Sequence, residues 1–150
     1  MQRVDFYVLD SQDARERLRF ACRVIDKAFQ AEHRVLVWCQ DGAELQALDD
    51  LLWSFAQDSF IPHEPASAES SWDEAPVLLS HGAAPPSAPD VLINLAAGVP
   101  PLVSASERVL EIIDADPARR QSGRARFKQY RDQGVEPTTH NIATGAGAGG

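Results

Sequence analysis

The pattern of apolar and polar positions predicts that strands and helices alternate along this chain. Apolar side chains at every second position indicate a strand over Arg3–Leu9. The unbroken apolar run Val35–Cys39 indicates a second strand that is covered on both faces. Between them, apolar residues recur at helical spacing over Ala14–Phe29. This helix is expected to begin at a capping box formed by Asp13 and Glu16.

The remaining periodicity extends this alternation to the end of the chain. A second helix is expected after a capping box at Asp41 and Glu44, and a last helix from about Pro117 to about Gln133, ended by Gly134. Further strands are expected at Val77–Leu79, Val91–Leu95 and Arg108–Ile113, and surface loops at Glu64–Pro76 and His81–Pro89. Strands that alternate with helices at this spacing predict right-handed crossovers and a mostly parallel sheet.

Composition fits one folded domain of ordinary size. The chain has 150 residues, 44% of them hydrophobic and 24% charged, which predicts one α/β domain over residues 1–142 and a flexible Gly/Ala tail over 143–150. No apolar run approaches the ~20 residues of a membrane span, and the first residues lack the apolar core of a signal peptide. Cys22 and Cys39 show neither a disulfide nor a zinc pattern, so a cytoplasmic protein is expected.

Charge is distributed unevenly along the chain. The formal net charge is −8, and Val35–Glu107 holds 11 acidic residues without a single Lys or Arg. Pro117–Arg131 instead holds six basic residues and no acid. An acidic body repels polyanions, so general nucleic-acid binding is disfavoured. One basic patch on such a body suits a small local anion, although a solvated helix face would give the same pattern.

The sequence offers no cofactor or metal site. The turn after the first strand, Leu9–Asp13, has no glycine and carries two acids, so it would repel a pyrophosphate. The four histidines lack metal-ligand spacing. His63 lies close in sequence to Asp58 and Ser59, but triads are assembled by the fold, and a histidine bonded to backbone in a loop is the favoured interpretation.

The last helix carries a more specific pattern. Arg120, Arg124, Phe127 and Arg131 fall within a narrow arc, with Lys128 on its flank. Gly123 and other small or aromatic residues form the adjacent stripe, which leaves room for a pocket. Guanidinium groups bind carboxylates with two hydrogen bonds, and an aromatic floor accepts an apolar side chain. This edge is suited to an acidic peptide that ends in a hydrophobic residue with a free carboxylate.

Three aromatic residues gather at the end of the second helix. Trp53, Phe55 and Phe60 lie beyond its leucine stripe. They either close the bottom of the core or form an exposed apolar patch of the kind that contacts a partner protein.

These stretches together resemble a known family, the chi subunit of the bacterial DNA polymerase III holoenzyme, which is part of its clamp-loader assembly. The matching segments are Val4–Leu9, Leu18–Cys22, Leu48–Trp53, Asp58–His63, Asp90–Leu95 and Arg124–Arg131. They follow the family's order over about residues 3 to 142. The resemblance implies a Rossmann-like α/β three-layer sandwich without a nucleotide-binding glycine loop, without a cofactor and without catalysis of its own.

The resemblance also implies two protein partners at the replisome. Chi proteins bind the acidic, phenylalanine-ending C-terminal tail of the single-stranded-DNA-binding protein, a role that falls here on Arg124, Phe127, Lys128 and Arg131. Arg124 is expected to bind the carboxylate, and position 127 is Phe where relatives carry Tyr. Chi proteins also bind the psi subunit through a surface that matches Trp53 and Phe60, and some members use that surface for a helicase.

Two other function classes compete with this interpretation. A small α/β enzyme, either a hydrolase or a nucleotide-modifying enzyme, would use His63 and Asp58. Direct binding of single-stranded DNA by the basic helix is disfavoured by the acid excess elsewhere.

Overall fold

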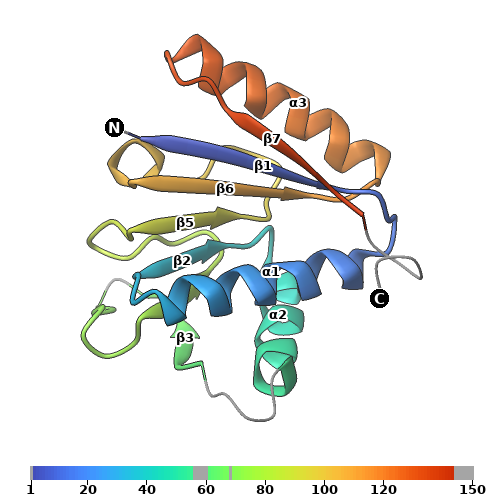
Figure 1. Ribbon diagram of the computed structural model, residues 1–150. Helices are drawn as coiled ribbons and strands as arrows, with labels where there is room; N and C mark the ends of the chain where they lie inside the picture. The colour runs from blue at the N-terminus through green and yellow to red at the C-terminus, as the bar shows by residue number, and fades with distance from the viewer. Residues whose placement is uncertain (1, 56–60, 68, 144–150) are drawn as a thin grey trace.

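A seven-stranded sheet forms the centre of the molecule (Figure 1). The computed structural model describes residues 2–55, 61–67 and 69–143. The strand order is β3-β4-β2-β5-β6-β1-β7, and all the pairs are parallel. The strands are β1 (Arg3–Leu9), β2 (Val35–Trp38), β3 (His63–Pro65), β4 (Val77–Ser80), β5 (Val91–Asn94), β6 (Arg108–Ile113) and β7 (Thr138–Ile142). The helices are α1 (Ala14–Gln30), α2 (Gly42–Phe55), α3 (Pro117–Asp132) and the short 3-10 helix η1 (Val103–Ala105).

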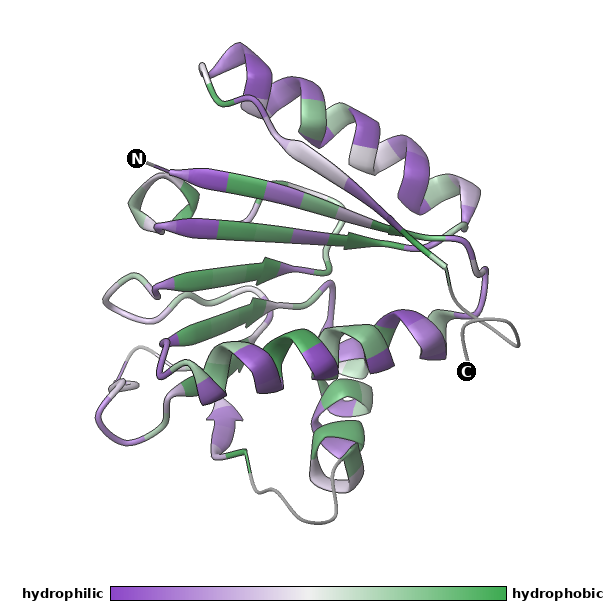
Figure 2. Cartoon of the chain, viewed as in Figure 1, coloured by the Kyte–Doolittle hydropathy of each residue, from purple (hydrophilic) through white to green (hydrophobic). Residues whose placement is uncertain are grey.

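Helices cover both faces of this sheet, so the predicted three-layer α/β sandwich is confirmed. Val35 and Val37 of β2 point into the core beneath α1 and α2, while Leu36 points into the core on the opposite face, where α3 packs. Successive side chains of a strand point to opposite faces, so a strand buried on both sides needs a continuous apolar run. In Figure 2 the central strands are green, the colour of hydrophobic residues, along most of their length.

The sequence pattern does not predict two of the strands, β3 and β7, and both lie at edges of the sheet. β3 has only three residues and ends in a proline, and β7 reads Thr-Thr-His-Asn-Ile, with mostly exposed side chains. Edge strands bury little surface, so they carry little of the apolar pattern that marks a strand. The predicted strand Arg108–Ile113 is β6, which is followed along the chain by β7 and lies between β5 and β1 in the sheet.

The predicted caps Asp13 and Asp41 are confirmed, whereas the two glutamates depart from the capping-box pattern. The Asp13 carboxylate accepts a hydrogen bond from the Arg15 backbone N–H, 2.9 Å away. The Asp41 carboxylate accepts one from the Glu44 N–H at 2.9 Å, and the Glu44 carboxylate accepts one from the Gln40 N–H at 2.8 Å. The two aspartates satisfy backbone donors that the first turn of a helix leaves free. Glu44 instead binds the N–H of a residue before the helix, and Glu16 pairs with Arg19.

One arginine of α1 lies on the buried side of the helix instead of facing solvent. Arg17 is buried, and its guanidinium lies 3.0 Å from a Glu44 carboxylate oxygen. It also donates hydrogen bonds to the carbonyls of Ile112 and Leu95. Arg17 therefore ties α1 to α2 and to the carboxyl ends of the central strands, which lie where many α/β proteins bind a cofactor.

The two cysteines are core residues, as the sequence indicates. Cys22 and Cys39 are buried and unpaired, and burial raises the pKa of each thiol to about 12. Both thiols stay protonated at neutral pH, and a protonated thiol is a poor nucleophile. No helix in the described part of the chain is long and apolar enough to cross a membrane.

Candidate functional site

The predicted binding residues of α3 meet around one depression on the surface. Arg124, Phe127, Lys128 and Arg131 line it together with Asp132, and its volume is about 590 Å³. Positions 124, 127, 128 and 131 follow the spacing that places side chains on one helix face. The structure therefore brings together all four residues that the sequence selected.

A second pocket lies directly beside this depression, between α3 and the sheet. Its volume is about 240 Å³, and Arg124 and Phe127 line both hollows. The other lining residues are Phe6, Val8, Ile113, Arg120, Gly123 and Thr139. The pocket thus has an apolar interior with two guanidinium groups at its rim.

Gly123 brings α3 close to the strand beneath this pocket. A Cβ atom at position 123 would lie 2.3 Å from Cδ1 of Ile113 in β6. Such a distance is far inside van der Waals contact, so only glycine allows this helix–strand approach without a shift of the neighbour. The sequence predicts that small residues leave room for a pocket here. Gly123 does line the pocket, and its missing side chain also lets α3 pack closely against Ile113.

The cations on the outer face of α3 are open to a ligand. Within the described residues, neither Arg124 nor Lys128 makes a hydrogen bond or an ion pair, and both are exposed. Arg131 lies 3.3 Å from the Glu136 carboxylate, and both side chains are exposed. Phe127 is half-buried, with its ring centroid 5.2 Å from that of Phe6.

Arg126, counted with the basic patch in the sequence, belongs instead to the core. Its guanidinium lies 3.0 Å from the Glu111 carboxylate, and both residues are buried. Tyr130 donates its hydroxyl to Glu111 at 2.8 Å, and the Asn94 amide donates at 3.0 Å. Burial raises the pKa of Glu111, against the opposing effect of Arg126 and of the hydrogen bonds. Burial beside Glu111 also raises the pKa of Tyr130.

Two further arginines hold the first turn of α3. Arg119 makes two hydrogen bonds of 2.8 Å to the Asp114 carboxylate, and Arg120 donates to the carbonyls of Asp114 and Leu9. Burial alone would raise the pKa of Asp114, but the hydrogen bonds from Arg119 and from the Asp116 N–H lower it. Of the six basic residues of this helix, Arg119, Arg120 and Arg126 therefore stabilise the fold. The other three, Arg124, Lys128 and Arg131, face outward.

The second predicted surface lies at the end of α2. Trp53 is 55% exposed, and its ring centroid is 4.5 Å from that of His63. Phe55 is half-buried against the core, so the three aromatic residues do not share one role. Phe60 lies outside the described residues, so its prediction is unchanged.

His63 is held by the fold rather than presented to a substrate. It is buried in β3, its Nδ1 lies 2.7 Å from the Ile61 carbonyl oxygen, and its Nε2 lies 3.0 Å from Asp49 Oδ1. Hydrogen bonding to backbone was predicted and is confirmed, but the residue begins a strand instead of lying in a loop. Asp58, its partner in the enzyme alternative, lies outside the described residues.

No cofactor or metal is assigned to these residues. The α1 N-terminus already holds the Asp13 carboxylate, which occupies the position where a helix would accept a phosphate. Across the described ranges, no group of three or more His, Cys, Asp or Glu side chains could hold a metal ion.

Comparison with known proteins adds evidence independent of this geometry. The family model described as "DNA polymerase III chi subunit, HolC" matches residues 1–138. The DNA polymerase III subunit chi of Pseudomonas aeruginosa is 42% identical over 142 residues, which cover 95% of this chain and 98% of that protein. The proteins of the same name from Haemophilus influenzae and Escherichia coli are 27% and 28% identical. Those matches cover 91% and 93% of this chain, and 95% and 97% of the relatives.

A solved structure supports the fold alone. The C-terminal domain of the DEAD-box protein Dbp5 superposes with a TM-score of 0.56 at 11% sequence identity, covering 93% of this chain and 91% of that one. The family match spans nearly the whole chain and agrees with the segments that carry the sequence resemblance. The chain therefore belongs to the DNA polymerase III chi subunit family and is an accessory subunit of the replication machinery.

Proposed function

We propose that this chain is a non-catalytic adaptor that bridges the psi subunit of the clamp loader to the C-terminal tail of the single-stranded-DNA-binding protein. It would act in the bacterial cytoplasm, at the replisome. The observation that carries the proposal is the outer edge of α3, where the exposed, unpaired Arg124 side chain borders an apolar pocket and Lys128 and Arg131 lie beside it. That combination matches the chemistry of an acidic peptide with a hydrophobic last residue and a free carboxylate.

The two adjoining hollows suggest how such a tail would lie. Arg124 lines both of them, so its guanidinium can bind the terminal carboxylate while the last side chain enters the pocket over Phe6 and Ile113. Lys128 and Arg131 then face the acidic residues that precede the end of the tail. Phe127 supplies apolar contact in place of a tyrosine hydroxyl. A small interface of this kind supports micromolar affinity, about −8 kcal/mol.

For the psi subunit, we propose the surface around Trp53, with Phe60 as the second contact. An exposed tryptophan is among the residues most often found at the centre of an interface. The sheet separates this surface from α3: α2 lies on one face and α3 on the other (Figure 1). The separation would let one molecule hold both partners. A helicase that uses the same surface would compete with psi.

The decisive experiment is a calorimetric titration with a synthetic tail peptide of the single-stranded-DNA-binding protein. Saturable binding that weakens with salt is expected, since the paired charges are exposed. The same peptide with an amidated C-terminus is the matched control and should bind at least about tenfold more weakly, because Arg124 loses its charged partner. Unchanged affinity for Arg124→Ala, or equal affinity for the amidated peptide, would reject the proposed site.

The two proposed surfaces can be separated with one further pair of variants. Trp53→Ala should lose psi in a binding assay and retain the tail peptide, and Arg124→Ala should do the opposite. Loss of both partners in either variant, with the protein still folded by circular dichroism, would argue against two independent sites.

A further inference from the structure

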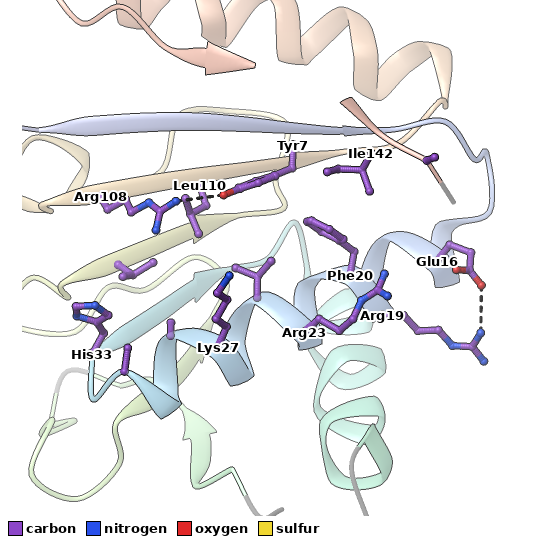
Figure 3. Close-up of a pocket in the computed structure, with 15 residues that line it drawn as sticks. Tyr7, Glu16, Arg19, Phe20, Arg23, Lys27, His33, Arg108, Leu110 and Ile142 are labelled. Carbon is purple, nitrogen blue, oxygen red and sulfur yellow. Dashed lines mark hydrogen bonds and ion pairs between the residues drawn. The ribbon is translucent and has the colours of Figure 1, made fainter. Parts of the chain in front are cut away.

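A second basic groove lies on the opposite face of the sheet from the α3 site. It runs between α1 and the strands β6, β1 and β7, and its volume is about 750 Å³ (Figure 3). Phe20 and Lys27 rise from α1 toward the strands, and Tyr7 and Leu110 face them from the sheet. The proposed adaptor function uses none of these residues.

The helical layer is incomplete above this groove. On this face α1 packs on β2 and β6 and α2 packs on β4, whereas neither helix packs as closely on β1 or β7. In α/β folds of this kind, helices normally cover both faces of a parallel sheet. Tyr7 and Ile142 consequently lie half-buried in the groove instead of beneath a helix.

The wall of the groove carries a regular row of cations. Arg19, Arg23 and Lys27 follow one another at four-residue intervals along α1. Arg108 on β6 also lines the groove, but its guanidinium lies 3.2 Å from the Asp5 carboxylate and donates a hydrogen bond to the Tyr7 hydroxyl. Arg19 lies 3.1 Å from Glu16, the one acidic residue among the lining side chains. Among the described residues, Arg23 and Lys27 make no ion pair. In a chain of net charge −8, this row is a local reversal of the general charge.

We propose that this groove binds an acidic amphipathic helix of a partner protein, laid beside α1 over β1 and β7. Its apolar face would cover the half-buried Tyr7 and Ile142 and complete the helical layer. Four residues of an α-helix rise about 6 Å, so carboxylates at every fourth position of the incoming helix match the row on α1.

Single-stranded DNA is the other ligand that a basic groove with aromatic residues could attract, and the ring geometry disfavours it. Bases bind such grooves by stacking on free ring faces. Here the Tyr7 ring stacks on His140 with centroids 4.9 Å apart and an interplanar angle of 19°. The ring centroids of Phe20 and Tyr7 are 5.5 Å apart, and the Arg23 guanidinium lies 5.6 Å from the centroid of the Phe20 ring. Tyr7 and Phe20 thus already pack against other side chains of this chain, which leaves them less free to stack on bases.

The proposal can be tested with a designed peptide and charge-reversal variants of the full chain. The probe is a stapled helix of about 15 residues with one leucine face flanked by glutamates, compared with a scrambled peptide of the same composition. A dissociation constant on the order of 10 µM is expected, with NMR shifts confined to α1, β1 and β7. The double variant Arg23→Glu/Lys27→Glu should weaken binding about tenfold or more.

The matched control is Arg15→Glu/Arg34→Glu, which changes the net charge equally at exposed positions outside the groove. It should bind the probe like the natural chain, and both double variants should keep the tail binding at α3. Equal weakening in both double variants, equal binding of the scrambled peptide, or no binding would overturn the proposal. If an oligo(dT) strand displaced the helix, the groove would be a site for single-stranded DNA, and the proposal would be overturned. If the chain self-associated and Arg23→Glu/Lys27→Glu abolished this, the occupant would be a second copy of the chain, which would also overturn the proposal.

Discussion

Arg124 and Arg126 stand two residues apart on α3 and have opposite environments. Arg126 is buried, bound to the Glu111 carboxylate, and fixed by a further hydrogen bond to the Ala97 carbonyl. Arg124 is exposed at the rim of two hollows and makes no ion pair or hydrogen bond within the described residues. Two positions along a helix correspond to about 200° of rotation, which turns one side chain to the core and the other to solvent.

The comparison shows how one helix combines fold and recognition. A buried charge must be paired, because an isolated ion loses its hydration without compensation. A recognition charge is most available when it is unpaired in the free protein, because an internal partner would compete with the ligand. The α3 helix meets both requirements with the same residue type, through the face that each arginine occupies.

The largest effect on stability is expected from substitution of Arg126, the buried arginine. Arg126→Ala leaves Glu111 buried without its cation, which should lower the free energy of unfolding by about 3–5 kcal/mol. Urea denaturation followed by circular dichroism measures it. Arg124→Ala is the matched control and should stay within about 0.5 kcal/mol of the natural chain. Similar losses in both variants would contradict the assignment of Arg126 to the fold and Arg124 to recognition.

A second test uses the ion pair that anchors the first turn of α3. Asp114→Asn should cost about 1.5–3 kcal/mol at neutral pH, because Arg119 loses a charged, buried acceptor. The folded state lowers the pKa of Asp114, so its contribution is present above pH about 4 and is lost as the pH falls further. The difference between the variant and the natural chain should therefore shrink in acid.

Urea midpoints measured across that pH range check this expectation. Glu69→Gln, at an exposed position, serves as the control and should show no such convergence. A gap that stays constant from neutral to acid pH would mean that the charge of Asp114 is not what stabilises the helix start.

The close approach of α3 to β6 gives a third, intermediate effect. Gly123→Ala places a methyl group against Ile113 Cδ1, and the overpacking should cost about 1–3 kcal/mol. Ile113→Val removes that carbon atom, so the double variant should be more stable than the sum of the two single losses predicts. Additive losses in thermal unfolding would show that the two side chains do not compete for the same space.

The smallest effect concerns the exposed ion pair beside the binding edge. Arg131 must leave Glu136 before it can meet a peptide carboxylate, so Glu136→Gln should strengthen tail binding about twofold, roughly 0.5 kcal/mol. Arg131→Ala should weaken binding less than Arg124→Ala does, since Arg124 has no such competitor. Calorimetric titrations of the three variants measure the order, and a larger loss for Arg131→Ala would reverse the proposed roles.

Most of the fold could be predicted from the sequence because its signals are local. The alternation in β1, the apolar run of β2 and the carboxylates at Asp13 and Asp41 each specify a structure within a few residues. The helical spacing from Arg124 to Arg131 predicted a common face in the same way. These patterns depend on backbone geometry and burial, which repeat along the chain.

Tertiary structure decided what depends on residues far apart in the sequence. Glu111 is the one acidic residue in the apolar strand β6, and this already indicates a buried carboxylate that needs a partner. Only the packing of α3 shows that the partner is Arg126. The burial of Arg17 has no local signal in the sequence, because its partners, Glu44 and two strand carbonyls, come from other elements. The sequence by itself determined which groups carry charge, whereas the fold decided which charges are paired, because pairing is a matter of distance in space.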